Sequence, residues 1–395
     1  MKILFVTPPP YLPNRLHRIR AFELLRILAK KHEVHLLSVI TKKDGIKDFK
    51  EIKKEVKSST VIKFSKFKAF KNCLLSPTLP LEVSYCNFEE VSKKIKHIVR
   101  KEKIDVVYLK RLRSAIYFSD WEVPVVLDST DAMSLFYKRM YSNTSFPRNI
   151  YYFLEGAKYK KFEKDTAGKI KSWIVCSEND ADYLKKIMNV NTNVVPNPVD
   201  TGYFKFSPIR PKGDVLLLRG LMDKQVNIDA AIYFVSRIFP LIKRKIPKAK
   251  LRIVGPFPTR VVRKLEDRKN IFVEGFVNDM RQCLESSTIS VCPIRIGTGT
   301  RHKILQSWAA GRPVVSTSIG AEGLNYKAGE NIEIANSSEE FAKKVVILLK
   351  DNERYKKLSL AGRKLVQKEY SLGVVANKLD QVLEHAKNQK RIKKQ

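Results

Sequence analysis

The stretch Cys292-Pro-Ile-Arg-Ile-Gly-Thr-Gly-Thr-Arg-His-Lys-Ile-Leu-Gln-Ser-Trp-Ala-Ala-Gly-Arg-Pro-Val-Val-Ser-Thr317 has the order of a strand end, a glycine loop, a helix, a glycine stop and a second strand. Gly297 and Gly299 let the backbone approach a bound group closely, and the free N–H groups of the first helical turn favour an anion. Arg301 and Lys303 add positive charge at the same helix start. The stretch therefore predicts a βαβ unit of a parallel sheet with a site for a diphosphate.

The glycine loop is not a signature of the two best-known nucleotide-binding classes. It lacks both the G-x-G-x-x-G spacing after a first strand and the G-x-x-x-x-G-K-[ST] pattern, so neither a classical dinucleotide enzyme nor a P-loop ATPase is predicted. A plain turn, with Gly311 ending the helix, is the alternative interpretation.

The same alternation of short apolar runs and helical stretches continues through the chain and predicts an α/β protein with two doubly wound parallel sheets. Residues 197–213 carry prolines and glycines without apolar periodicity, and they form the expected domain boundary. Strands are expected in the first series at 2–7, 33–40, 104–110, 123–128, 173–176 and 193–196, and in the second at 215–218, 250–254, 271–273, 289–293, 313–317 and near 332–335. Helices are expected at 19–31, 149–168, from 178, 227–245, 279–286, 301–310, and after the last strand to the end of the sequence.

Length and composition agree with two soluble-type domains. The chain has 395 residues, and no apolar run approaches the roughly 20 residues of a membrane-spanning helix or the core of a signal peptide. We therefore expect a cytoplasmic protein. The five cysteines show no metal-ligand spacing and are expected to be reduced core thiols.

The net charge of +36 predicts attraction to phosphates or to anionic lipid. Basic residues crowd in 42–71 and in the tail 387–394, although solvated helix faces explain each cluster singly. No nucleic-acid-binding module and no interleaving of aromatic with basic residues is present, so a nucleic-acid partner is not expected. An anionic membrane surface and phosphorylated small molecules fit the charge better.

Residues 297–324, which end in Gly320-Ala-Glu322-Gly323-Leu324, resemble the donor-site signature of family-four glycosyltransferases of the GT-B fold, in particular a subgroup with a Gly-x-Gly-Thr-Arg loop. Four further segments resemble the same family: Pro8-Pro9-Pro10 with Arg20-Ala21-Phe22-Glu23-Leu24-Leu25, Val175-Cys-Ser177-Glu178, Val195-Pro-Asn-Pro-Val-Asp200, and Gly220-Leu-Met-Asp223 with Asn227 and Asp229. The resemblance spans most of the chain and is strongest in the second half.

The resemblance implies the transfer of a sugar from a nucleotide-diphosphate donor, with retention and without an essential metal or cofactor. It implies a GT-B fold in which two Rossmann-like domains face each other across a cleft. Residues 1–200 would bind a lipid-linked or polysaccharide acceptor in cell-envelope glycan synthesis, and residues 201–370 would bind the nucleotide sugar. Residues 371–395 would form a helix returning toward the first domain and a basic tail, with the protein peripheral on the inner membrane face.

Site residues follow from the same resemblance. Arg301, Lys303 and Asp131 are the expected catalytic group. The expected donor-binding residues are Gly220, Gly275, Phe276, Gly297, Thr298, Gly299, Thr300, Gln306 and Glu322. The expected acceptor-binding residues are Arg15, Arg18 and Asp128, although the polar cluster at this strand end also fits a helix N-cap formed by Asp131 or Thr130, and the arginines fit a solvated turn.

The sequence departs from the family pattern at two functional positions. Many members have two glutamates separated by seven residues, and the aligned positions here hold Thr298 and Gln306. An amide has one acceptor oxygen where a carboxylate has two charged ones, which weakens a ribose contact by about 1–3 kcal/mol. The alternative function is therefore a weakened or inactive GT-B-fold protein that binds or scaffolds at the membrane surface.

Overall fold

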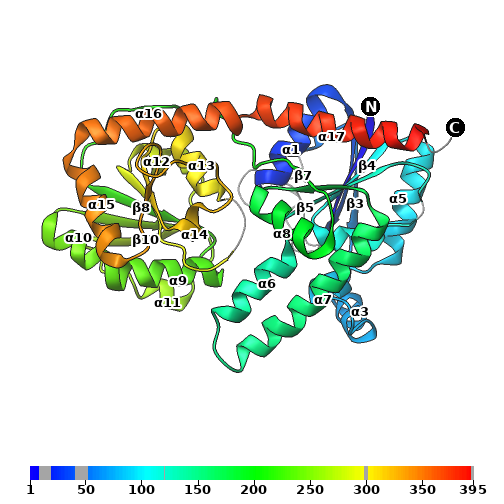
Figure 1. Cartoon of the computed structure of the whole chain (residues 1–395), viewed down its shortest axis with the longest axis horizontal. Helices are drawn as coiled ribbons and strands as arrows, with labels where there is room; N and C mark the ends of the chain where they lie inside the picture. The colour runs from blue at the N-terminus through cyan, green and yellow to red at the C-terminus, as the bar shows by residue number, and fades with distance from the viewer. Residues whose placement is uncertain (9–18, 41–51, 120, 298–300, 393–395) are drawn as a thin grey trace. The chain divides into compact units, whose positions relative to one another are not determined.

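The computed structural model describes residues 1–8, 19–40, 52–119, 121–297 and 301–392, and the chain divides into two compact units (Figure 1). The first unit comprises Met1–Pro198 and Leu372–Gln395, and the second comprises Val199–Ser371. Each unit contains one all-parallel sheet covered by helices. The predicted α/β fold with two doubly wound sheets is confirmed.

The sheet of the first unit has seven strands in the order β3-β2-β1-β4-β5-β6-β7. Their apolar runs are buried because helices cover both faces, as is usual for parallel strands. The bounds are β1 (Lys2–Thr7), β2 (Glu33–Ile40), β3 (Ser58–Lys63), β4 (Val106–Lys110), β5 (Val125–Thr130), β6 (Ser172–Val175) and β7 (Asn193–Val194).

Side chains of β1 alternate between the two faces of this sheet. Ile3 and Phe5 pack with α1 (Ile19–Lys31) and with α17 (Leu372–Ile392), the last helix of the chain. Leu4 and Val6 pack on the opposite face. That face is covered by α5 (Glu89–Lys101), the 3-10 turn η2 (Leu112–Tyr117), α6 (Met133–Ser142), α7 (Arg148–Lys169) and α8 (Glu178–Met188).

The sheet of the second unit has six strands in the order β10-β9-β8-β11-β12-β13. They are β8 (Val215–Arg219), β9 (Lys250–Val254), β10 (Ile271–Gly275), β11 (Ile289–Cys292), β12 (Val314–Ser316) and β13 (Glu333–Ile334). One core contains α9 (Gln225–Tyr233), the π-helical turn η3 (Phe234–Ile238), α10 (Phe239–Lys245), α11 (Arg260–Arg263) and α15 (Ser338–Lys350). The other contains α12 (Met280–Glu285), α13 (His302–Ala309), α14 (Ser318–Ala321) and α16 (Asn352–Glu369).

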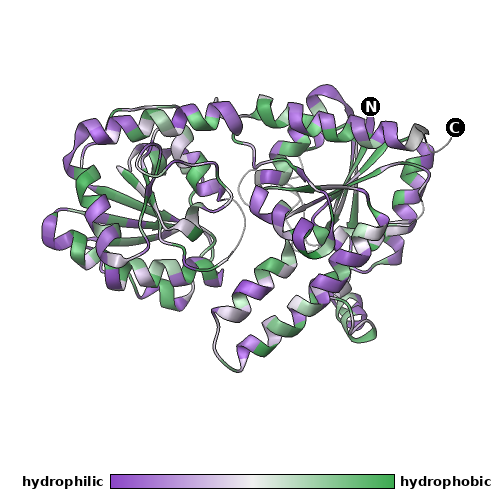
Figure 2. Ribbon diagram, in the orientation of Figure 1, coloured by the Kyte–Doolittle hydropathy of each residue, from purple (hydrophilic) through white to green (hydrophobic). Residues whose placement is uncertain are grey.

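Among the residues described for the first unit, six elements were not predicted from the sequence. They are β3, α5, η2, α6, and two short helices before α5, α3 (Lys66–Leu75) and α4 (Leu81–Tyr85). In Figure 2 the strands are mostly green, whereas α6 and α7 are banded green and purple. The outward-facing apolar residues of α3 hide its helical period, whereas α5 has a regular inward face of Val91, Ile95, Ile98 and Val99 that the sequence analysis overlooked.

Two further observations concern the helices and the cysteines. Among the described helices, none combines the length and the apolar character required to cross a bilayer. All five cysteines are free thiols, and Cys73 is half-buried on α3 while the other four are buried.

Candidate functional site

The site of the second unit lies where its strand order reverses. β8 and β11 are neighbours, and the chain leaves them in opposite directions, toward β9 and toward β12. In open α/β sheets, ligands bind beyond the carboxyl ends of the strands at such a point. The carboxyl ends of β8 and β11 lead directly into Gly220 and into the predicted diphosphate loop that contains Gly297.

Gly220 and Gly255 permit a very close approach of two strand ends. A Cβ on Gly255, which has a φ of +152°, would lie 1.7 Å from the carbonyl oxygen of Gly220. A Cβ on Gly220 would lie 2.6 Å from the side chain of Asn227. The backbone at this edge therefore leaves no room for side chains at either position, and α9 begins directly against it.

Arg219, the last residue of β8, is a buried cation that the sequence analysis did not identify. Its side chain is 6% exposed, and burial lowers the pKa of its guanidinium to about 10. Nη1 donates to Gln306 Oε1 at 2.6 Å, and Nη2 donates to the carbonyl oxygen of Lys303. Nε is buried without a hydrogen-bond partner. Arg219 thus holds the first turns of α13 against the end of β8.

Lys303 and Arg301 carry the positive charge at the start of α13. Lys303 Nζ donates to Asn227 Oδ1 at 2.9 Å, and burial lowers the pKa of Lys303 to about 8. The nearby positive charges of Arg301 and Arg219 contribute to this lowered pKa, although burial is the larger cause. Nε and Nη2 of Arg301 are buried and have no hydrogen-bond partner.

No carboxylate forms an ion pair with any of these three cations in the part of the chain that the structure describes. A buried charge without a counter-ion is costly, and an anion placed among these groups relieves that cost. The start of α13 also favours an anion, because a helix N-terminus carries a partial positive charge. The arrangement is therefore suited to hold a ligand with two or more negative charges.

The other described donor candidates lie at the same edge of the sheet. Gly275 ends β10 with a φ of +66°, its carbonyl accepts from Gly255 N at 2.8 Å, and Phe276 beside it is 48% exposed. Glu322 follows α14 at the end of β12 and is half-buried. Gln306 is 7% exposed and is turned toward Arg219. The predicted residues Thr298, Gly299, Thr300, Arg15 and Arg18 lie outside the described residues.

In the first unit, Asp128 is the centre of a buried polar cluster. Its Oδ2 accepts from Arg20 Nη2 at 3.1 Å, from Lys110 Nζ at 2.9 Å and from Tyr108 OH at 2.6 Å. Although burial acts in the opposite direction, Arg20 and Lys110 hold the pKa of Asp128 below its usual range. The side chain is fully buried, so the structure gives Asp128 a stabilising role, and its predicted contact with an acceptor remains a prediction.

Asp131 lies beyond the end of β5 and contacts two loop residues. Its Oδ1 accepts from Cys176 Sγ at 3.4 Å, and its Oδ2 lies 3.8 Å from Arg111 Nη1. Asp180 is nearby, but it accepts from Ala132 N at 2.9 Å and from the Ser177 hydroxyl, as expected for an acidic residue at a helix start. The predicted catalytic role of Asp131 stays a prediction.

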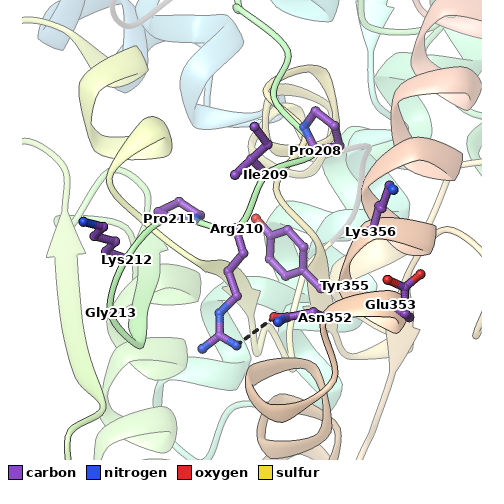
Figure 3. Close-up of a pocket in the computed structure, with 10 residues that line it drawn as sticks. All are labelled: Pro208, Ile209, Arg210, Pro211, Lys212, Gly213, Asn352, Glu353, Tyr355 and Lys356. Atoms are coloured by element: carbon purple, nitrogen blue, oxygen red, sulfur yellow. Dashed lines mark hydrogen bonds between the residues drawn. The ribbon is translucent and has the colours of Figure 1, made fainter.

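A separate surface pocket of about 540 Å³ lies at the opposite edge of the second sheet (Figure 3). It is lined by residues 208–213 and by the start of α16. Arg210 is the most prominent cation there, but it donates to Asn352 Oδ1 at 3.3 Å, to Leu349 O and to Asp214. Since its donors serve to hold residues 208–213 against α16, this pocket is not the anion site.

Most of the second unit is similar to a known protein family. The family model Glycosyl transferases group 1 matches residues 213–351. An uncharacterized 44.6 kDa protein in the cps region of Klebsiella pneumoniae is 24% identical over 246 residues, which cover 60% of this chain and 62% of that protein.

Solved structures are similar over nearly the whole chain. Sucrose-phosphate synthase (tll1590) from Thermosynechococcus elongatus has a TM-score of 0.72 at 14% identity and covers 97% of this chain and 98% of its own. Anabaena Alr3699/HepE in complex with UDP-glucose has a TM-score of 0.66 at 14% identity, and the match covers 98% of this chain and 100% of that one. Residues 213–351 therefore match Glycosyl transferases group 1, and the chain as a whole has the predicted GT-B fold.

Proposed function

We propose that the protein is a glycosyltransferase that uses a nucleotide-diphosphate sugar as its donor. The observation that carries this proposal is the group of three cations, Arg219, Arg301 and Lys303, without carboxylate partners at the strand-order reversal of the second unit. They belong to the segment that matches the glycosyltransferase family model, and a structural neighbour holds UDP-glucose.

Each cation has a distinct place in the proposed donor complex. Arg301 and Lys303 would contact the diphosphate and neutralise the charge that develops on the departing nucleotide, which is the main catalytic contribution expected where no metal takes part. Arg219 would act as a positioning residue, because it binds Gln306 and the backbone of Lys303. Gln306 Oε1 is occupied by Arg219, which leaves the amide nitrogen for a ribose hydroxyl.

The finer features of the proposal rest on the resemblance to family-four glycosyltransferases with a Gly-x-Gly-Thr-Arg loop. They are retention of configuration, metal independence without a cofactor, and a lipid-linked or polysaccharide acceptor bound by the first unit with help from Asp131. The relative in a cps region supports a role in cell-envelope glycans. We place the protein in the cytoplasm, with peripheral contact to the inner membrane face.

The proposal is tested by calorimetric titration of the protein with UDP, GDP and ADP. We expect one of the three to bind at micromolar to low-millimolar Kd, and Arg301→Ala to weaken it about 10–100-fold, the scale of one or two charge-assisted hydrogen bonds. Arg281→Ala is the matched control, since Arg281 is paired with Asp279 in the same unit. Equal affinity in the Arg301→Ala variant would contradict the proposed site.

The second candidate function is a GT-B-fold binding or scaffolding protein without transfer activity, favoured by glutamine at position 306. In that case none of the three nucleotides binds up to several millimolar, which corresponds to less than about 4 kcal/mol of binding free energy. Binding of a nucleotide together with sugar transfer excludes this alternative.

The pKa of Lys303 predicts that nucleotide binding weakens at alkaline pH. Burial lowers this pKa to about 8 in the free protein, and a bound diphosphate raises it again. Binding therefore takes up a proton above pH 8, and affinity should fall by up to about tenfold per pH unit between roughly pH 8 and pH 9.5. Titration with a UDP-sugar at several pH values measures this slope, and Lys303→Met should abolish it. An affinity that stays constant over this range contradicts the prediction.

A further inference from the structure

The first unit exposes its large hydrophobic side chains in two stretches only. Of the residues described for this unit, all those large hydrophobic side chains that are exposed fall within 67–81 or 141–154. The exposure is high, reaching 78% for Phe67 and 77% for Phe146. Single exposed hydrophobic residues are ordinary, but a concentration of them in two segments marks an interaction surface.

The first stretch contains α3, a helix whose apolar face points away from the protein. Phe67, Phe70 and Leu74 follow each other at three- and four-residue spacing and are all more than 60% exposed. On the other side, Ala69 is the only fully buried residue of this helix. An ordinary surface helix turns its apolar side to the core, so α3 requires another apolar environment to cover Phe67, Phe70 and Leu74.

The second stretch is the end of the hairpin formed by α6 and α7, which projects from the first unit (Figure 1). Aromatic contacts hold the two helices together: the rings of Tyr137 and Tyr159 stack at 4.9 Å, and Tyr141 contacts Phe153 at 5.6 Å. The exposed hydrophobic residues therefore stand on a packed scaffold.

A hydrogen bond links the first stretch to α7, near the second stretch. The backbone N–H of Leu81 donates to Glu155 Oε2 at 2.8 Å, so the end of the α3 stretch is anchored to α7 directly beside the exposed Leu154. We call the exposed side chains of residues 66–81 and 138–154 the basic apolar surface.

The charged residues of this surface are all basic. The sequence has no acidic residue between Glu55 and Glu82 and none between Asp131 and Glu155. Within these intervals lie eight lysines and arginines, and Lys66, Lys68 and Lys71 are exposed on α3 beside the phenylalanines. A second copy of the same surface would meet like charge, whereas an anionic lipid surface offers both phosphates and an apolar interior.

We propose that the basic apolar surface binds an anionic lipid bilayer. The phenylalanines and leucines enter the boundary between headgroups and acyl chains, and the lysines contact lipid phosphates. This mode of binding is interfacial and requires no membrane-spanning helix. The idea that membrane binding brings the protein to a lipid-linked acceptor rests on the proposed function. The binding of this surface to a bilayer does not depend on that function.

The test is co-sedimentation of the full chain with vesicles of phosphatidylcholine, alone or mixed with phosphatidylglycerol. We expect binding to the mixed vesicles that decreases with added salt, and little binding to phosphatidylcholine alone. The double variant Phe67→Glu/Phe70→Glu should bind at least about tenfold more weakly. Each of Lys66→Gln, Lys68→Gln and Lys71→Gln should reduce binding about fivefold. These side chains are exposed, so the variants should fold normally.

Ile209→Glu provides the matched control, because Ile209 is 76% exposed but belongs to the second unit. It should bind vesicles as the parent protein does. Unchanged vesicle binding by Phe67→Glu/Phe70→Glu overturns the proposal, as does equal binding to both vesicle types. A third outcome also overturns the proposal: sedimentation without lipid shows an oligomer of the parent protein, and the double variant is monomeric. In that case the surface binds a second copy of the chain.

Nucleotide titration separates this inference from the proposed function. Phe67→Glu/Phe70→Glu should retain the nucleotide affinity of the parent protein, and Arg301→Ala should retain its vesicle binding. Loss of vesicle binding by the Arg301→Ala variant would contradict a membrane surface located on α3 and the α6–α7 hairpin.

Discussion

Replacing Asp128 with asparagine should lower the free energy of unfolding of the first unit by about 3–5 kcal/mol, the usual cost of removing one partner from a buried ion pair. Asp128 faces Arg20 and Lys110, and all three side chains are at most 5% exposed. Asparagine preserves the shape but leaves both cations without a counter-charge. Urea unfolding followed by circular dichroism and tryptophan fluorescence measures the change.

Two comparisons make this prediction specific. Asp131→Asn is the matched control, since Asp131 lies three residues further on and is partly exposed, and it should change stability by less than about 1 kcal/mol. The double variant Asp128→Asn/Lys110→Met should recover part of the loss because one buried charge is removed with its partner. A single variant as stable as the parent protein would show that the cluster contributes nothing.

The pH dependence of this effect has a defined sign. Arg20 and Lys110 hold the pKa of Asp128 below its usual range, so the stabilisation is present above the unfolded-state pKa of about 4. It is lost as the pH falls further, when the folded protein takes up the proton. The difference in stability between the parent protein and Asp128→Asn should therefore shrink below about pH 4.

Gly255→Ala should destabilise the second unit by about 3–5 kcal/mol and abolish nucleotide binding. The added Cβ would lie 1.7 Å from the Gly220 carbonyl oxygen, and a φ of +152° is strained for alanine. Relief requires the ends of β8 and β9 to separate, which moves Arg219 away from α13. Urea unfolding and nucleotide calorimetry on the same preparation report both effects.

Gly329→Ala separates backbone strain from the clash. Gly329 also has a positive φ, +77°, but a Cβ there has no atom within 4 Å. Its cost should be about 1 kcal/mol, and nucleotide affinity should stay unchanged. If Gly255→Ala unfolds at the same urea concentration as Gly329→Ala, the close approach at the strand ends has no energetic importance. If the Gly255→Ala variant is insoluble while the Gly329→Ala variant is soluble, the result agrees with the prediction.

Several elements were predictable because their local pattern agrees with their final environment. The strands β1 and β8 are buried on both faces, so their sequences Lys-Ile-Leu-Phe-Val-Thr and Val-Leu-Leu-Leu-Arg are apolar runs. The helix α1 turns Leu24, Leu25 and Leu28 to the core, and this face has the helical period. The order of loop and helix around Gly297 also predicts an anion site, and that site stays a prediction.

The helix α3 shows why other elements escaped prediction. Its apolar residues face outward, and lysines are interleaved with them, so the pattern that ordinarily marks a core-facing helix is absent. Its position depends on contacts with residues outside the helix, such as the hydrogen bond that Asn72 Nδ2 donates to the carbonyl oxygen of Asn87. These contacts are not encoded in any local window of sequence.

Lys110 and Arg219 show most clearly what the sequence determines by itself and what only the tertiary structure decides. Both are basic residues at the end of an apolar strand, and the sequence alone determined that each strand is buried. Only the strand order decided their roles. β5 lies beside β4 and places Asp128 opposite Lys110, so that charge is neutralised inside the first unit. β9 lies beside β8 and places Val254 opposite Arg219, which leaves Arg219 without a carboxylate partner among the described residues, because neutralisation of a buried charge depends on which chain segments become neighbours.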